Sequence, residues 1–124
     1  MLEELIEQLK EIEVLTIRYY TSDIKAENRE ADRVSISVKH TALMKSDYRY
    51  KSAFRTKHYR SQYEIPLEKV HNKVTGGDFG SKTRNNPSQA DEAATAIQNM
   101  IDCARNEISD RNSFNPFRRY GIDH

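Results

Sequence analysis

The sequence predicts one small α+β domain, and three observations lead to this fold class. The chain has 124 residues, a usual length for a single domain. Apolar residues near both ends follow the i, i+3, i+4, i+7 spacing of amphipathic helices, whereas residues 34–57 alternate between apolar and polar, as half-buried strands do. We expect an N-terminal helix, a small antiparallel sheet of two to three strands and a C-terminal helix packed on the sheet. Residues 1–111 form this domain and residues 112–124 a C-terminal tail.

The N-terminal helix is expected to run from residue 2 to about residue 20. Its second half is ambiguous, because the β-branched and aromatic residues at alternate positions in 14–20 also suit a strand. The chain is only 36% hydrophobic, which predicts a thin core. The apolar stripe of this helix either packs on the sheet or pairs with its counterpart in a second copy. Its members are Leu2, Leu5, Ile6, Leu9 and Ile12.

A β-hairpin is predicted in the middle of the chain. Residues 34–38 read Val-Ser-Ile-Ser-Val, a strict alternation, and residues 45–47 have turn chemistry. Residues 48–57 then place tyrosine and phenylalanine rings on one side of an extended chain and lysines and arginines on the other. A helix in this region would leave Tyr48 and Tyr59 unexplained, so we favour a strand.

Three further segments complete the predicted domain. Residues 62–70 alternate around Pro66, which suits an edge strand or a strand that ends where a short helix begins. Residues 75–87 hold three of the four glycines and predict a long, mobile loop. From Ser88 to Asp110, a cap-like start and an apolar stripe predict the C-terminal helix.

The charges are distributed unevenly along the chain, although the formal net charge is only +1. Residues 39–60 contain seven lysines and arginines against one aspartate, whereas residues 1–14 and 88–110 are acidic. On the predicted hairpin these cations form a basic sheet face, with two loop cations as auxiliaries. The predicted partner-binding residues are Arg49, Lys51, Arg55, Lys57, Lys82 and Arg84.

The basic sheet face predicts a small non-enzymatic binding or regulatory protein, an inhibitor or adaptor that meets an acidic protein surface. One alternative is a nucleic-acid-binding protein that uses the same cations on phosphates. The aromatic rings lie on the opposite side of the strand from the cations, which counts against base stacking. A third alternative is a structural subunit, such as a homodimer, that assembles through its helices while the basic face is only solvated.

Several kinds of chemistry are not expected. Residues 76–83 resemble a phosphate-binding loop but lack its glycine and lysine spacing. His40 and His58 would face each other across the hairpin as packing groups, and Cys103 lies within an apolar stripe. We expect no metal, no cofactor and no catalytic residues. A lone cysteine, and no signal peptide or membrane-spanning run, indicate a cytoplasmic protein that does not bind membranes.

Overall fold

The computed structural model describes residues 2–54, 59–81 and 85–112, and every regular element in them is helical. These residues contain no strand or sheet, so the predicted α+β fold is wrong. The elements in chain order are α1 (Leu2–Thr21), α2 (Arg29–Lys45), α3 (Asp47–Ala53), the π-helical turn η2 (Arg60–Glu64), α4 (Ile65–Thr75) and α5 (Pro87–Asn112).

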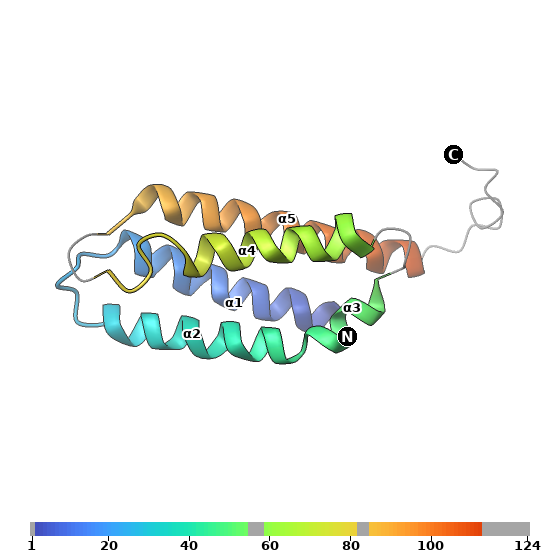
Figure 1. Ribbon diagram of the computed structural model, residues 1–124, viewed down its shortest axis with the longest axis horizontal. Coiled ribbons are helices and arrows are strands. Elements are labelled where there is room, and N and C mark those ends of the chain that lie inside the picture. Colours follow the sequence, from blue (N-terminus) through green and yellow to red (C-terminus); the bar gives the residue numbers. More distant parts are fainter. Residues whose placement is uncertain (1, 55–58, 82–84, 113–124) are drawn as a thin grey trace.

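Four of these helices form an elongated bundle. In Figure 1, α1, α2, α4 and α5 lie side by side, and each runs in the opposite direction to the one before it. α1 packs against both α2 and α5, and α4 packs mainly against α5. The connection 22–28 and the described residues 76–81 lie at one end of the bundle, and the short helix α3 lies at the other.

The two predicted terminal helices are present as α1 and α5, and they supply most of the core. Leu5, Leu9 and Ile12 of α1 are fully buried, as are Ile97 and Met100 of α5. The apolar stripe of α1 is therefore covered inside the bundle by other helices of the same chain, rather than by a sheet.

Residues 34–38, predicted as a strand, form the middle of α2. The helix buries Ile36 and turns Val34 and Val38 to the outside, so the alternation does not mark a sheet face. The polar residues of the buried side have partners on other elements of the bundle; the buried Asp32 carboxylate, for example, accepts two hydrogen bonds from the Arg18 guanidinium of α1 at 2.7 and 2.8 Å. Three of the five buried residues of α2 are polar, so a pattern of apolar residues does not reveal its helical spacing in the sequence. The five buried residues are Arg29, Asp32, Ile36, His40 and Leu43.

The predicted second strand is also wrong, because its first part is α3. Tyr50, Ala53 and Phe54 are buried with the i, i+3, i+4 spacing of a helix. Tyr48, which the strand prediction placed in the core, is exposed. The helical alternative is thus correct for this segment, and Tyr48 needs no place in the core.

The predicted edge strand at residues 62–70 is replaced by η2 and α4. Pro66 has no N–H, and its ring excludes a carbonyl oxygen from the usual position four residues earlier. The chain meets this constraint with a wider π-helical turn, in which the Ile65 N–H bonds the Arg60 carbonyl oxygen five residues back. This turn and α4 then bury one continuous side, consisting of Tyr63, Leu67, Val70 and Val74.

Candidate functional site

The predicted basic sheet face does not exist in the described chain. Of its six residues, Arg49 and Lys51 lie on α3, and the other four (Arg55, Lys57, Lys82 and Arg84) lie outside the described residues. The Arg49 guanidinium lies 3.8 Å from the Glu4 carboxylate of α1. The nearby Lys39 ammonium is bound to a second α1 carboxylate. Two cations of the basic segment therefore lie beside carboxylates of the acidic first helix. Whether the six predicted residues contact a partner stays a prediction.

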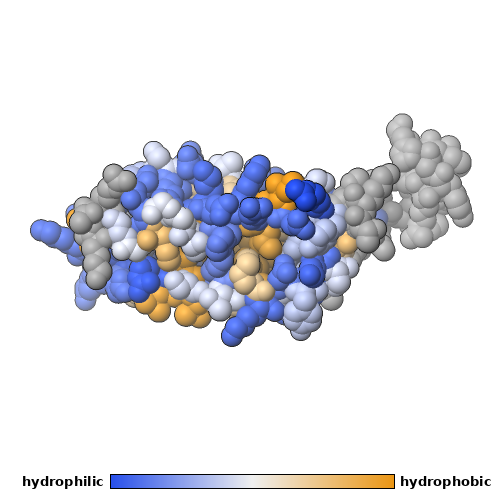
Figure 2. All heavy atoms as spheres, in the orientation of Figure 1, coloured by the Kyte–Doolittle hydropathy of each residue, from blue (hydrophilic) through white to orange (hydrophobic). Residues whose placement is uncertain are grey.

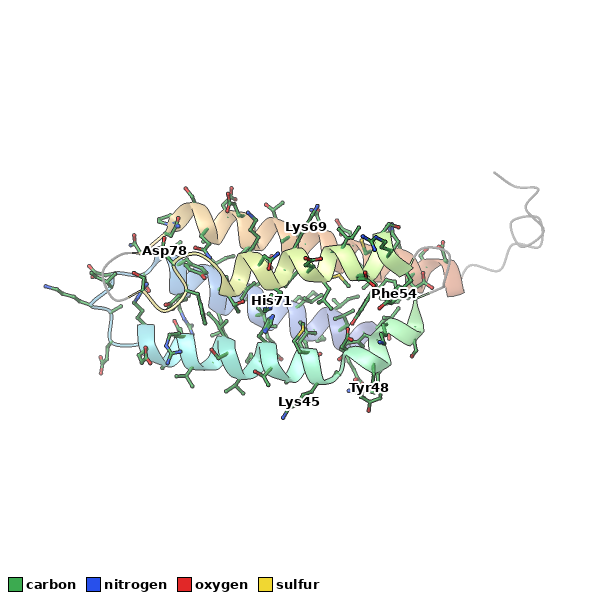
Figure 3. All side chains as sticks on the ribbon, in the orientation of Figure 1. Lys45, Tyr48, Phe54, Lys69, His71 and Asp78 are labelled. Atoms are coloured by element: carbon green, nitrogen blue, oxygen red, sulfur yellow. The ribbon has the colours of Figure 1, made fainter. Side chains whose placement is uncertain are left out.

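A histidine pair connects α2 to α4. His40 Nε2 lies 3.1 Å from His71 Nδ1, and the two rings are tilted against each other with centroids 4.9 Å apart. Figure 3 shows His71 on the side of α4 that faces α2. Burial, and then the neighbouring ring, lower the pKa of His40. This hydrogen bond needs an N–H on one ring nitrogen and an unprotonated nitrogen on the other. The facing nitrogens of the two histidines are therefore used in a contact between helices, and neither is free to act as a catalytic base. The predicted partner, His58, lies outside the described residues.

A buried glutamine organises the loop end of the bundle. Gln89 of α5 places its Nε2 2.7 Å from the Gly76 carbonyl oxygen and 2.9 Å from the Tyr20 hydroxyl, and its Oε1 accepts the Asp78 N–H at 3.1 Å. The Tyr20 hydroxyl in turn donates to the Val74 carbonyl oxygen at 2.6 Å. Burial raises the pKa of Tyr20, which keeps the phenol protonated for this role.

Arg29 extends the same network to α2. Its guanidinium donates to the Tyr19 carbonyl oxygen at 2.7 Å and lies 4.4 Å from the centre of the Tyr19 ring. The Tyr19 hydroxyl accepts the Gly80 N–H at 2.7 Å. The hollow beside it is about 150 Å³, smaller than ordinary ligand pockets. These polar groups bond the backbone of the loop, so the network positions the loop and leaves little room for a ligand.

The outer side of α2 is an exposed, partly apolar surface of the described chain. Val34 and Val38 are 45% and 63% exposed, and Ala31, Thr41 and Ala42 are exposed beside them. We call these five residues the α2 outer face. Figure 2 shows apolar residues at the lower edge of the molecule, where α2 lies. A shallow hollow of about 380 Å³ runs along part of it, lined by Ser37, Val38, Thr41, Ala42 and Lys45.

Two charged side chains of α2 beside this face are held in ion pairs, whereas Lys45 lines the hollow. Arg33 binds Glu30 on its own helix at 2.6 Å, and Lys39 binds Glu11 of α1 at 2.7 Å. The face is therefore uncharged along its length, with Glu30 at one end and Lys45 at the other. In Figure 3, Lys45 and the exposed Tyr48 both point away from the bundle on this side. The sequence signal for this face is visible only once residues 29–45 are read as a helix.

Catalytic and metal chemistry find little support in the described residues. No three His, Cys, Asp or Glu side chains among them are grouped as a metal ion requires. Cys103 is partly buried on α5, and burial raises the pKa of its thiol, which disfavours a nucleophilic thiolate. No helix in the described chain is both long and apolar enough to cross a bilayer.

Comparisons with protein-family models, with curated protein sequences and with solved structures find no match for this chain. The function is therefore inferred from the residues of the bundle alone.

Proposed function

We propose that this chain is a non-catalytic helical module that associates with another protein chain through the α2 outer face. The observation that carries this proposal is the exposure of Val34 and Val38 on an uncharged helix surface. Burying a valine side chain is worth about 1.5–3 kcal/mol, so covering the exposed parts of these two would contribute about 2 kcal/mol. Contiguous apolar surface on a chain this polar is typical of a contact site.

Neither the inhibitor or adaptor with a basic sheet face nor the nucleic-acid-binding hairpin is carried forward, because both required a sheet. The described cations Arg18, Arg33, Lys39 and Arg49 each lie beside a carboxylate. An uncharged face favours a protein surface with matching apolar residues over phosphates or a strongly acidic partner.

The proposal is supported by what the other polar clusters do. The histidine pair and the Gln89 network are both engaged in contacts between helices or with the loop backbone. Neither presents a nucleophile, base and open pocket together, which is what a catalytic site needs. A role in association uses the surface that the fold leaves uncovered.

Site-specific cross-linking tests the proposal directly. A photoreactive amino acid is placed at position 38 and, as the matched control, at position 14 of α1. Val14 and Val38 are 61% and 63% exposed, so the two probes start with equal access to solvent. We expect irradiation in an extract of the source cells to give a discrete covalent product from position 38 and none from position 14. Equal products from both positions, or none from position 38, would refute the proposed function.

A further inference from the structure

We infer that the histidine pair between α2 and α4 is an acid-sensitive latch, which opens when the rings of His40 and His71 both carry a proton. The latch is a conformational device of the bundle and goes beyond the proposed function. It does not depend on the α2 outer face, because His40 lies on the buried side of α2.

The histidine pair is the polar connection between the two helices. α2 packs mainly against α1, and α4 packs mainly against α5. Among the described residues, the contact of His40 Nε2 with His71 Nδ1 at 3.1 Å is the only hydrogen bond or ion pair that joins α2 to α4. Loss of this contact therefore removes the polar attraction between them.

The number of protons on the two rings decides whether the bond exists. A neutral imidazole has one N–H and one unprotonated nitrogen, whereas an imidazolium has two N–H groups and no acceptor. Two neutral rings, or one neutral and one charged ring, supply the donor and the acceptor that the bond needs. With both rings charged, two N–H groups and two positive charges face each other across 3.1 Å. The second proton thus replaces the bond with repulsion.

The two rings differ in their access to water. His71 is exposed, so protons reach it from solvent, whereas His40 is only 7% exposed. Burial, and then the neighbouring His71 ring, lower the pKa of His40, so His40 takes the second proton. The latch is therefore closed above the ordinary histidine pKa of 6.5 and opens as the pH falls below that value.

The charged groups around the pair are engaged elsewhere. Those on α2, on α4 and on the helices packed against them form ion pairs of their own, namely Lys39 with Glu11, Arg33 with Glu30 and Lys73 with Glu92. Asp47 of α3 accepts a hydrogen bond from Tyr63, and the Tyr20 phenol of α1 donates to an α4 carbonyl oxygen. Glu68 lies one turn before His71 on α4, is exposed and forms no ion pair with His71. Within the described chain, no carboxylate therefore accepts the second N–H of the charged pair.

Opening of the latch uncovers apolar surface between the two helices. Ile36 and Leu43 of α2 lie within one turn of His40, and Val70 and Val74 of α4 lie within one turn of His71. All four are at most 1% exposed in the closed bundle. The packing of α2 on α1 and of α4 on α5 does not involve the histidine contact. The open form is thus a bundle that is parted along one side, and not an unfolded chain.

Hydrogen–deuterium exchange of the full chain at about pH 7.5 and about pH 5.0 tests the latch, because histidine titrates between these values. Each rate is corrected for the intrinsic effect of pH on amide exchange. We expect the protection of α2 and α4 amides to fall by about tenfold or more at the lower pH, since buried polar groups lose their partners. The protection of α1 and α5 amides should change by less than about threefold.

Two amide substitutions each keep a polar partner at the contact and remove one titrating ring. A glutamine amide replaces the Nε2 side of a histidine ring and an asparagine amide its Nδ1 side, so the variants are His40→Gln and His71→Asn. Neither variant can bring two positive charges together, so α2 and α4 should keep their protection at the lower pH. The control Glu68→Gln retains both rings and should open like the parent chain. Circular dichroism at the higher pH checks that each variant is folded, and one folded amide variant is enough for the test.

Each outcome bears on the latch alone. Unchanged protection at the lower pH, or an equal loss in all four long helices, would overturn the latch. A loss that persists in a folded His40→Gln or His71→Asn would overturn the need for two charged rings. Protection retained in Glu68→Gln would assign the response to that carboxylate and also overturn the latch. The cross-link at position 38 is measured separately, so the latch and the proposed function can fail independently.

Discussion

Replacement of Gln89 should destabilise the bundle far more than its position in the first turns of α5 suggests. Gln89→Ala removes the partners of the Lys73 carbonyl oxygen and the Asp78 N–H, two groups at the partly buried loop end of the bundle, whereas the Gly76 carbonyl oxygen keeps the Phe79 N–H. Each group left without a partner costs about 1–3 kcal/mol when it is buried. Because water reaches part of this loop, we expect a total loss of about 2–4 kcal/mol. That is a large part of the roughly 5–15 kcal/mol that stabilises a domain.

The matched control lies on the same helix. Gln98 is exposed and donates to the Glu13 carboxylate at 2.8 Å, so Gln98→Ala should cost less than about 0.5 kcal/mol. Urea unfolding followed by circular dichroism at 222 nm measures both variants. Gln89→Glu keeps the shape but removes both N–H donors, and it should cost at least as much as Gln89→Ala. Equal stabilities for Gln89→Ala and Gln98→Ala would show that the network does not hold the loop.

Three further predictions concern the same bundle. Gly77→Ala should lower the free energy of unfolding by about 1–3 kcal/mol, because the residue has φ +55° and a Cβ would lie 2.7 Å from the Gln89 side chain. Gly80→Ala has φ +84° but no neighbour within 4 Å, so only the backbone strain remains and the loss should be about 1–2 kcal/mol. The same urea assay measures both variants. Leu9→Ala should lower the free energy of unfolding by about 2–5 kcal/mol, and a smaller loss in thermal unfolding would contradict its place in the core. Because the pKa of His40 is lowered in the folded chain, the unfolded chain binds a proton at this ring more tightly than the folded chain does. The stability contributed by the neutral ring is therefore present above pH 6.5 and is lost as the pH falls below it. His40→Leu should make urea unfolding less dependent on pH between about 8 and 5.5, and an unchanged pH profile would refute this role.

The terminal helices could be predicted from the sequence because long stretches of their buried sides are apolar, although Thr16 of α1 and Gln89 and Glu107 of α5 are buried as well. Leu5, Leu9 and Ile12 repeat at helical spacing, and no polar residue interrupts that run. α2 could not be predicted in the same way, because its buried side includes Arg29, Asp32 and His40. Their partners come from α1, α4 and the loop, which are far away in the sequence.

The candidate site was missed for a related reason. A five-residue alternation at 34–38 satisfies a strand as well as a helix, and the β-branched residues favoured the strand. Reading the wider window from Arg29 to Leu43 at helical spacing assigns Ile36 to the core and the two valines to the outside. The basic segment was correctly identified as a concentration of charge, but its opposing carboxylates lie on α1 and were visible only in the folded chain.

The segment Val34–Val38 of α2 has a further consequence when the chain unfolds. Val34–Val38 is short, β-branched and without charge, a composition that favours pairing between unfolded chains. Arg33 and Lys39 stand immediately before and after it, so two such segments that align bring cations close together. Light scattering during refolding should therefore rise faster for Arg33→Gln/Lys39→Gln than for the parent chain, and equal rates would exclude this protective effect. The two cations that leave the folded surface uncharged thereby also act as gatekeepers against aggregation.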